Sequence, residues 1–177
     1  DSISESSKEI NFSIDETRHL IKVLKKREGD QIKVTNGKGL EWIGQISSFT
    51  SKHASASKLK AIYKLRSKNN LHIAISPTKS SSRMEWFIEK VTEIGAKEIT
   101  PIICFHSERR RFNLDRYQRI MVNAIKQSRQ FFLPRLNPVI SFNNFIESYT
   151  TNSSLYIAHC HEMNKIQINE IKNFKEN

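Results

Sequence analysis

The amino-acid sequence predicts an α/β protein with a small β-rich N-terminal module, residues 1–67, followed by a parallel-sheet domain, residues 68–177. An Asn-Gly turn and a stretch of strict alternation indicate that the first part consists mainly of strands. After the polar segment 66–70, short apolar runs alternate with amphipathic segments, which is typical of a parallel sheet covered by helices. A chain of 177 residues is long enough to bury a core in each part.

One helix is predicted in the N-terminal module. Ser13 and Glu16 have the spacing of a capping box, in which each side chain bonds the backbone N–H of the other residue. We expect the helix to run from there to about Arg27, with Gly29 as a left-handed stop. Its predicted apolar face consists of Leu20, Val23 and Leu24. Its outer face carries Arg18, Lys22, Lys25 and Lys26.

The strands of the module are predicted from one tight turn and from one segment in which apolar and polar side chains alternate. Asn36-Gly37 suits the positive φ angles of a tight turn, so residues 31–46 are expected to form a hairpin. Residues 58–65 alternate between apolar and mostly charged side chains, which predicts a half-buried strand. The side chains expected on its buried face are Leu59, Ala61, Tyr63 and Leu65. The Ser-rich segment 47–58 is predicted as a loop or weak strand.

Beyond the module, predicted strands and helices alternate. The predicted strands are 71–77, 98–103, 138–140 and 154–160. The predicted helices are 82–96, 114–130, a short one that contains Phe142, Phe145 and Ile146, and a last piece at 165–175. Asn113 is expected to cap the helix at 114–130.

The segment 82–96 is the best-marked helix of the chain. Ser82 and Glu85 have capping-box spacing. The apolar stripe expected to pack on the sheet comprises Met84, Phe87, Ile88, Val91 and Ile94. Taken alone, its charged side chains indicate a solvated face with weak helix pairs.

The charge balance favours a polyanionic partner. The sequence has 29 Lys and Arg residues against 18 Asp and Glu, a net charge of +11 and a pI near 9.8. Because the basic residues cluster, nucleic acid is the favoured partner. The alternative is that part of this charge only keeps the protein in solution.

Motifs that are absent exclude several classes of function. The sequence has no GxGxxG, Walker, HExxH or GxSxG motif, which excludes most nucleotide-hydrolase, dehydrogenase and serine-hydrolase functions. Cys104 and Cys160 lie far apart, which argues against a metal site and favours a reduced, cytoplasmic setting. No apolar run approaches the ~20 residues that span a bilayer, so no membrane partner is expected.

The tract 106–116 is the first candidate contact with nucleic acid. It follows a predicted strand and therefore lies at the carboxyl edge of the sheet, where open α/β sheets bind ligands. Arg109, Arg110 and Arg111 in this loop suit phosphate contacts. The alternative is a solvated charge run, and the position of the tract favours binding.

The tract 126–135 interleaves basic residues with Phe131 and Phe132, and two interpretations of it stay open. The phenylalanines can stack on single-stranded RNA, or they can pack in a core or a subunit interface. Near the end of the chain, His159 adjoins Cys160 at the end of a predicted strand. Too few further ligands lie at usable spacing for a metal, and a structural role for this histidine is favoured over ligand contact.

The order and spacing of several short motifs resemble one enzyme family. The N-terminal motifs are His19-Leu20, Val23-Leu24, Gly29-Asp30 and Asn36-Gly37-Lys38-Gly39. The later motifs are Arg83-Met84-Glu85-Trp86, Lys90-Val91-Thr92-Glu93-Ile94-Gly95, Ile99, Pro101, Ser107-Glu108-Arg109, Ala124, Gln127-Ser128-Arg129 and Pro134. From about residue 12 onward the chain resembles the bacterial 16S ribosomal RNA uridine-N3 methyltransferases of the SPOUT superfamily.

The resemblance implies a PUA-like RNA-binding module followed by a SPOUT α/β domain with a deep trefoil knot, which forms homodimers. It implies methyl transfer from S-adenosylmethionine to N3 of a uridine in 16S ribosomal RNA, with the small ribosomal subunit as partner and no metal. The family's two cofactor loops are absent, so we expect a fragment that lacks the knot, is inactive and binds no cofactor; we also expect the module's first strand to precede Asp1. The competing hypothesis is a non-catalytic RNA-binding or ribosome-assembly protein.

Residue roles follow from the resemblance and from the basic tracts. Arg83 and Arg109 are the candidate catalytic cations, because a nearby positive charge stabilises a developing uridinate. RNA binding is assigned to Arg18, Lys22, Lys25, Lys26, Arg83, Arg109, Arg110, Arg111 and Arg129. The residues expected to support the site are Glu85, Lys90, Glu93, Gln127 and Ser128, of which the two glutamates are expected to orient arginines. His159 is the candidate cofactor contact, and no catalytic base is assigned.

Overall fold

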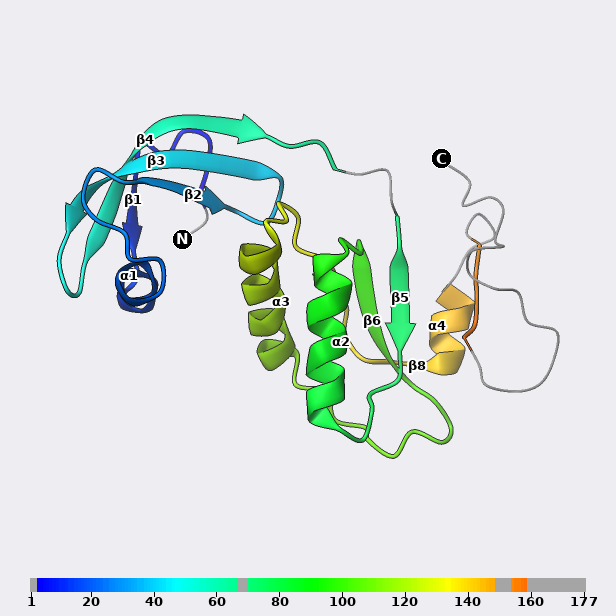
Figure 1. Ribbon diagram of the computed structural model, residues 1–177. Coiled ribbons are helices and arrows are strands. Elements are labelled where there is room, and N and C mark those ends of the chain that lie inside the picture. Colours follow the sequence, from blue (N-terminus) through cyan, green and yellow to red (C-terminus); the bar gives the residue numbers. More distant parts are fainter. Residues whose placement is uncertain (1–2, 67–69, 149–153, 159–177) are drawn as a thin grey trace.

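The computed structural model describes residues 3–66, 70–148 and 154–158, which contain two four-stranded sheets (Figure 1). The first half comprises β1 (Glu9–Phe12), α1 (Ile14–Lys22), β2 (Gln31–Thr35), β3 (Leu40–Phe49) and β4 (Ala54–Tyr63). The second half comprises β5 (His72–Ile75), α2 (Ser81–Glu93), β6 (Glu98–Ile103), α3 (Leu114–Ser128), β7 (Arg135–Leu136), β8 (Ile140–Ser141) and α4 (Phe142–Ser148). Over these ranges, no helix has the length and apolar character of a membrane span.

The N-terminal sheet is antiparallel, with the strand order β1-β4-β3-β2. Its central turn follows the prediction, because Asn36 Oδ1 accepts hydrogen bonds from the N–H groups of Lys38 (2.8 Å) and Leu40 (3.2 Å). Trp42 on β3 is fully buried, and its indole N–H donates to Ser7 O at 3.0 Å. The buried residues of this core are Leu20, Ile32, Trp42, Ile46, Ala54 and Ala56.

The first helix begins as predicted but ends earlier. Both hydrogen bonds of the capping box between Ser13 and Glu16 are present. The helix stops at Lys22, where a run to about residue 27 was expected, because Lys25 takes a left-handed conformation with φ of 50° and turns the chain toward β2. Val23 and Leu24 lie beyond this stop and are 63% and 48% exposed, so the predicted apolar face is wrong at both positions.

The strand predicted at 58–65 is longer, and its buried part lies elsewhere. β4 starts at Ala54, inside the Ser-rich segment, and β1 pairs with its first half only. Leu59, Tyr63 and Leu65 are 52%, 61% and 97% exposed, which contradicts their predicted burial. The fully buried residues of β4 lie in the half that β1 extends, whereas Ala61 of the second half is partly buried against the same core.

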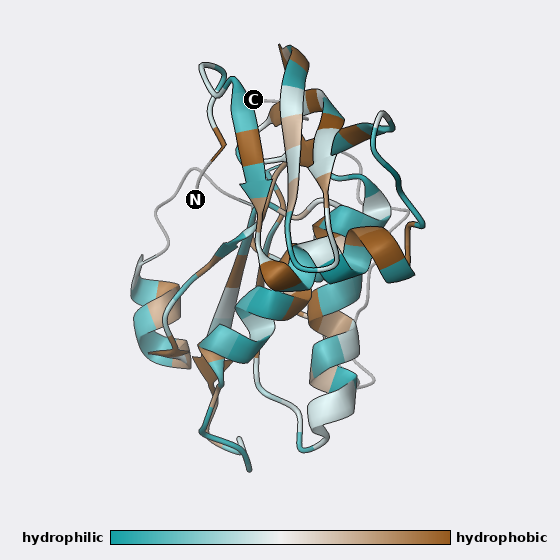
Figure 2. Ribbon diagram, turned by 90° about the vertical axis from the view of Figure 1, so that its left-hand side faces the viewer, coloured by the Kyte–Doolittle hydropathy of each residue, from teal (hydrophilic) through white to brown (hydrophobic). Residues whose placement is uncertain are grey.

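The second sheet is parallel, as predicted. Its order is β5-β6-β7, and β8 also pairs with β6. In Figure 1, α2 and α3 lie on one face of the sheet and α4 on the other. Both hydrophilic and hydrophobic positions occur along each long helix (Figure 2), as expected of helices with one buried face. The buried core residues are Met84, Ile88, Val91, Ala96, Ile99, Tyr117 and Met121.

The ends of α2 differ from the prediction, whereas the start of α3 confirms it. The capping residue of α2 is Ser80, whose Oγ accepts from the Arg83 N–H, so Ser82 lies inside the helix and the predicted capping box is wrong. Ile94 follows the last helical residue and is 63% exposed, although it was expected in the buried stripe. Asn113 caps α3 by accepting from the Arg116 N–H at 3.0 Å.

The later strands are only partly predicted. Where one strand was expected at 138–140, the sheet uses the two short strands β7 and β8, with Pro138 and Val139 between them. Residues 154–158 are not in a strand, contrary to the strand predicted at 154–160. The rest of that segment and the helix predicted at 165–175 lie outside the described residues.

The two halves are joined by a contact that we call the seam, formed by residues 36–39 after β2 and residues 131–133 after α3. Lys38 and Phe132 form an antiparallel bridge across it, and these two segments also meet in Figure 1. Two backbone hydrogen bonds of 2.9 and 2.8 Å flank the bridge, from Gly39 N–H to Phe131 O and from Leu133 N–H to Gly37 O. The seam therefore has the geometry of a short piece of sheet.

Gly39 is required at the seam. Its φ is +97°, a conformation that side chains rarely adopt, and a Cβ there would lie 2.6 Å from Cζ of Phe132. The side chains around the two aromatic rings are cationic: Lys64 Nζ lies 5.1 Å from the centroid of Phe131, and the Arg66 guanidinium carbon lies 5.2 Å from that of Phe132. The seam thus combines backbone pairing, a close glycine contact and two cation–π contacts.

Candidate nucleic-acid interface

The loops that follow β5 and β6 meet at the carboxyl end of the parallel sheet, where ligand sites of open α/β sheets occur. Ser76 Oγ and Ser107 Oγ lie 2.7 Å apart, and Ser107 Oγ accepts a 2.8 Å hydrogen bond from the Cys104 N–H. Lys79 and Glu108 add an ion pair of 3.1 Å between the same two loops. Side-chain bonds therefore hold this end of the domain together.

Arg109 is fixed against the start of α2. Its Nη1 donates to Ser81 Oγ at 2.5 Å, and Ser81 is the first residue of the helix. The N-terminus of a helix carries partial positive charge on its free N–H groups. A guanidinium and a positive helix end thus lie side by side, which is an arrangement that attracts anions.

An open hollow beside this loop is lined by residues 109–115 and by Val139. Arg110 and Arg111 are exposed on it. Asp115 is the one acid among the described residues that line it. Three successive arginines against one carboxylate make the hollow suitable for phosphate groups.

Arg83 and Glu85 lie at the same end of α2 but do not act as a pair. Arg83 is exposed in the first turn. Glu85 forms an ion pair of 2.8 Å with Nη2 of Arg116 on α3. This corrects the expectation that Glu85 orients one of the candidate arginines, because its partner is a residue on the neighbouring helix that same-helix spacing did not indicate.

Tyr117 is the buried polar residue of this region and is 4% exposed. Burial is the largest cause that raises the pKa of Tyr117, and the Glu85 carboxylate acts in the same direction, while Arg109 and Arg116 lower it. The phenol therefore stays neutral at physiological pH. Its ring centroid lies 4.3 Å from that of Phe112, so the tyrosine packs against the end of the arginine loop.

The residues predicted to support the site lie mostly at the other end of α2 and α3. Lys90 Nζ pairs with Glu89 (2.8 Å) and Glu93 (2.9 Å), so Glu93 orients a lysine and not a candidate arginine. The hydrogen bond to Glu89 is the main cause that raises the pKa of Lys90. Glu93 is ten residues beyond Arg83 in the helix, which is about 15 Å along its axis.

Gln127 and Ser128 also fall at this far end, in the last turn of α3. Gln127 is exposed, and Ser128 Oγ donates to the backbone O of Ala124 at 2.7 Å. Arg129 follows as the helix cap, with φ of 58°, next to the seam. The structure does not bring these three predicted residues to Arg109.

The cations of the first helix form a third group. Arg18, Lys22 and Lys25 are exposed and Lys26 is partly buried. Arg18 also forms an ion pair of 3.6 Å with Asp15. The predicted RNA contacts are therefore divided among α1, the carboxyl end of the sheet and the seam.

The structure gives Phe131 and Phe132 a packing contact within the chain. Both rings are partly buried in the seam, where Lys64 and Arg66 lie over them. Packing between the two halves of one chain therefore accounts for their partial burial.

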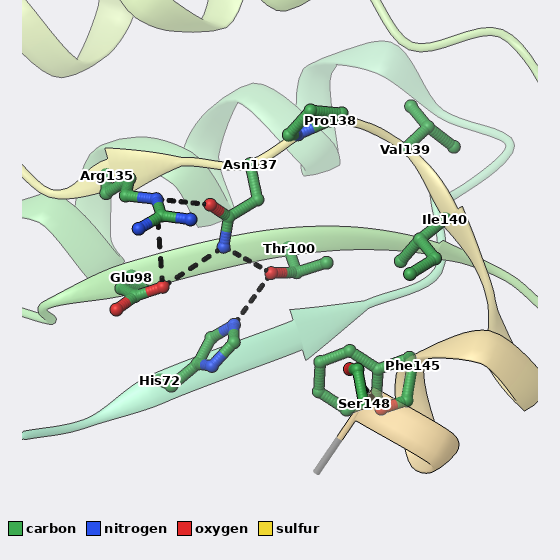
Figure 3. A pocket seen from close by; sticks show the side chains of 10 residues that line it. All are labelled: His72, Glu98, Thr100, Arg135, Asn137, Pro138, Val139, Ile140, Phe145 and Ser148. Carbon is green, nitrogen blue, oxygen red and sulfur yellow. Dashed lines mark hydrogen bonds and ion pairs between the residues drawn. The ribbon is translucent and has the colours of Figure 1, made fainter.

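A second hollow, of about 530 Å³, lies on the face of the parallel sheet that α4 covers (Figure 3). It was not predicted. Thr100 Oγ1 lies 2.7 Å from His72 Nε2 and accepts from Asn137 Nδ2 at 2.8 Å. Asn137 also donates to Glu98 Oε2 (3.2 Å) and accepts from Arg135 Nε (2.7 Å). The polar residues at alternate positions of β6 were the available signal for this network.

The His72 side chain is neutral in this network. Burial is the largest cause that lowers the pKa of His72, with Arg135 acting in the same direction and Glu98 against it. The ring also contacts Phe145 of α4 edge-on, with centroids 5.6 Å apart. The bonds within the network fix β5, β6 and β7 relative to one another, which is a structural role.

No group of three or more His, Cys, Asp or Glu side chains in the described part of the chain could hold a metal ion. His159, the predicted cofactor contact, lies outside the described residues.

Comparison with known families then relates this arrangement to function. A family model described as an RNA methyltransferase domain matches residues 65–177, well over half of the chain, and one described as an RNA methyltransferase PUA domain matches residues 14–59. The chain belongs to the RNA methyltransferase domain family.

Relatives and solved structures agree with this membership in the RNA methyltransferase family. The ribosomal RNA small subunit methyltransferase E of Rickettsia conorii is 24% identical over 99% of this chain and 70% of its own length. The protein of the same name from Buchnera aphidicola is 26% identical over 84% of this chain and 61% of its own length. A crystal structure of a probable rRNA-methyltransferase from Porphyromonas gingivalis has 33% identity and a TM-score of 0.74, over 82% of this chain and 61% of that one.

A further structure, of a small subunit methyltransferase E from Neisseria gonorrhoeae bound to S-adenosyl methionine, has a TM-score of 0.67 over 85% of this chain and 64% of that one. At 23% identity it supports the fold alone. The chain thus spans 61% of the length of the Buchnera and Porphyromonas proteins. Together with the two sheets, these matches confirm the predicted fold class, a PUA-like module followed by a SPOUT-like methyltransferase domain.

Proposed function

We propose that the whole protein is an S-adenosylmethionine-dependent methyltransferase that acts on N3 of a uridine in small-subunit ribosomal RNA, and that the described residues bind and position the RNA. The observation that carries the proposal is the Arg109 loop, tied to the start of α2 at the carboxyl end of the sheet in a member of the RNA methyltransferase family. The names of the curated relatives support small-subunit ribosomal RNA as the substrate class.

The described residues suit RNA and do not fit the cofactor. S-adenosylmethionine supplies the methyl group as a sulfonium cation, which arginines repel. The five glycines of the chain are Gly29, Gly37, Gly39, Gly44 and Gly95, and none lies in the loops after β5 and β6. With three arginines lining the hollow, we expect calorimetric titration of this chain to show no cofactor binding, and micromolar affinity would contradict that expectation.

The chemistry that these residues can provide is stabilisation of negative charge on the base. N3 of uridine carries a proton, which passes to water before or as the methyl group leaves the sulfonium and bonds to N3. Until that bond forms, the negative charge spreads onto the two neighbouring carbonyl oxygens. A guanidinium has five N–H donors, and Ser81 accepts one hydrogen bond from Arg109. We propose that Arg109 uses its other donors on the uracil or its phosphate, with exposed Arg83 as the second candidate.

Exposed apolar residues on and just after α2 support a homodimer. Trp86 in the second turn of α2 and Ile94, which caps its other end, are each 63% exposed, which is high for large apolar side chains. A second copy of the chain would cover them. Light scattering of Trp86→Lys, with Lys52→Gln as a surface control, tests this: an unchanged dimer, or no dimer in the parent protein, contradicts the proposal.

The function is tested with the full-length protein, S-adenosylmethionine and small ribosomal subunits, with methylated uridine measured by mass spectrometry. Loss of one charge-stabilising donor reduces kcat by about 10²–10³-fold in other enzymes, and we expect this of Arg109→Met. Ser81→Ala, which frees Arg109 from its anchor, should cost less, and Lys52→Gln in the distant β3–β4 turn should cost nothing. RNA binding without any methylated uridine would support the competing non-catalytic hypothesis, and full activity of Arg109→Met would exclude the role of this residue.

A further inference from the structure

Three exposed cations lie in or beside the seam, and they come from segments that are far apart in the sequence. Lys38 is paired with Phe132 in the bridge, and the Arg66 guanidinium lies 5.2 Å from its ring centroid. Arg129, the cap of α3, precedes Phe132 by three positions. We call these three residues the seam cations, and all three are exposed.

The seam cations are not neutralised by nearby acids. Two acids near the seam already have cationic partners: Glu41, which is 6% exposed, binds Lys64 (2.8 Å) and Lys33 (3.5 Å). Glu93, whose backbone O accepts from Gln130, binds Lys90 (2.9 Å). The hydrogen bond between Glu41 and Lys64 is the main cause that lowers the pKa of the first of these acids, so Glu41 stays ionised. In the described part of the chain, none of the seam cations forms an ion pair with a carboxylate.

The position of these cations depends on the docking of the two halves. The bridge and its two flanking hydrogen bonds hold residue 38 beside residue 132, while the missing Cβ of Gly39 lets the Phe132 ring lie against the turn. Without this contact, nothing in the fold would hold Lys38, in the turn after β2, beside Arg129 at the end of α3. The concentration of charge therefore depends on the docking.

We propose that the seam is a second RNA-contact surface, at which the seam cations bind the sugar-phosphate backbone. A polyanion is the partner that fits three unpaired cations, and the planar guanidiniums of Arg66 and Arg129 match phosphate oxygens. The surface is separate from the Arg109 loop, because α3 has 15 residues and its ends lie about 22 Å apart. The choice of RNA as the polyanion rests on the proposed function.

The first test is the salt dependence of RNA binding. Fluorescence anisotropy with a labelled small-subunit ribosomal RNA fragment is measured between low and physiological salt, for the parent chain and for Lys38→Gln/Arg66→Gln/Arg129→Gln. Each lost phosphate contact lowers the magnitude of the slope of log K against log salt by about 0.7–0.9. The slope of the triple variant should therefore be smaller in magnitude by about 2 than that of the parent chain. These side chains are exposed, so the variant should fold normally.

Lys52→Gln is the matched control. It removes one exposed lysine from the same sheet, at the other end of β3, which is about 30 Å away for a strand of ten residues. We expect no change in its slope. Equal slopes for the parent, triple and control chains would overturn the proposal, as would an equal loss per charge in the control.

The second test breaks the docking without removing a charge. Phe132→Ala deletes the ring that contacts Arg66 and packs against the turn at Gly39, and we expect its salt slope to approach that of the triple variant. Circular dichroism and thermal unfolding establish whether it is folded. A folded Phe132→Ala chain with the parent's slope would show that docking does not assemble the surface.

The outcome is independent of methyl transfer. If the full-length protein does not methylate uridine but the triple variant still loses salt dependence, the function proposed above fails and the seam surface stands. If methylation occurs and the seam variants bind RNA like the parent, only the seam proposal fails. Preference for an acidic protein over RNA in competition would also overturn it.

Discussion

The two ends of α2 and α3 are held by different kinds of contact. At the seam, backbone hydrogen bonds and a glycine-to-ring contact join residues 36–39 to residues 131–133. At the carboxyl end of the sheet, hydroxyl and guanidinium groups join the loops, as in the bond from Arg109 to Ser81. Backbone pairing at the seam is lost only if the two halves separate, whereas a guanidinium can leave a hydroxyl for a phosphate without such a change. This difference indicates that the seam fixes the relative position of the two halves, whereas the carboxyl end of the sheet is suited to binding a ligand.

The largest effect is expected from a disulfide engineered across the seam. Non-hydrogen-bonded antiparallel pairs have Cα atoms about 4.5 Å apart, within the range of a disulfide. Lys38→Cys/Phe132→Cys, in a chain with Cys104→Ser and Cys160→Ser, should therefore form a disulfide on oxidation. It closes a loop of about 90 residues, for which we expect stabilisation of about 4 kcal/mol in urea unfolding. Failure of the cysteines to pair would show that the seam is open in solution.

The next largest effect is expected from adding a methyl group at the seam. Gly39→Ala places a Cβ 2.6 Å from Phe132 Cζ at a φ of +97°, and strain plus overpacking should cost about 3 kcal/mol. Gly29→Ala is the matched control, because its φ is +86° and nothing lies within 4 Å. The control should lose only the backbone strain, about 1–2 kcal/mol. Equal losses in the two variants would mean that the ring contact contributes nothing.

A substitution at the carboxyl end of the sheet should lower the free energy of unfolding less than Gly39→Ala does at the seam. Ser107→Ala removes the acceptor of the Cys104 N–H and the partner of Ser76, and a partly buried unpaired donor costs about 1–2 kcal/mol. Ser6→Ala, at an exposed position near the N-terminus, should be close to neutral. Urea unfolding of both variants measures the difference. A loss from Ser107→Ala larger than from Gly39→Ala would reverse the comparison between the two ends.

The smallest expected effect is the pH dependence of the free energy of unfolding that His72 causes. This residue lies on the parallel sheet, between the two ends compared above. Burial lowers the pKa of His72 in the folded protein, so the unfolded chain takes up the proton first as pH falls. The stability from the neutral ring is complete above the ordinary pKa of 6.5 and is lost below it, as pH falls toward the lowered folded value. Urea midpoints between about pH 7.5 and 5 should fall less for His72→Gln than for the parent. Identical slopes would contradict the neutral assignment.

The sequence predicts those features that depend on neighbouring residues. The capping box of Ser13 and Glu16, the Asn36 turn and the cap at Asn113 all form as expected, because each needs only three or four consecutive residues. The position of the Arg109 loop was also predictable, since carboxyl ends of parallel strands share an edge.

The errors have a common cause in contacts between distant segments. Leu59 and Tyr63 alternate as a buried strand would, but the fully buried residues of β4 lie in its other half. Glu85 was expected to orient one of the candidate arginines and instead pairs with Arg116 on α3. The seam was missed because nothing near Lys38 in the sequence indicates that Phe132 lies beside it.

The seam also affects the order in which the chain folds. Its two segments are about 90 positions apart, and closing a loop of this length is slow and entropically unfavourable until both partners are ordered. On the ribosome, the turn at residues 36–39 emerges and folds long before residues 131–133 are synthesised. The nascent protein therefore has a period in which the N-terminal module is folded but undocked. Docking is then a late step of maturation that assembles a charged surface on an already folded module.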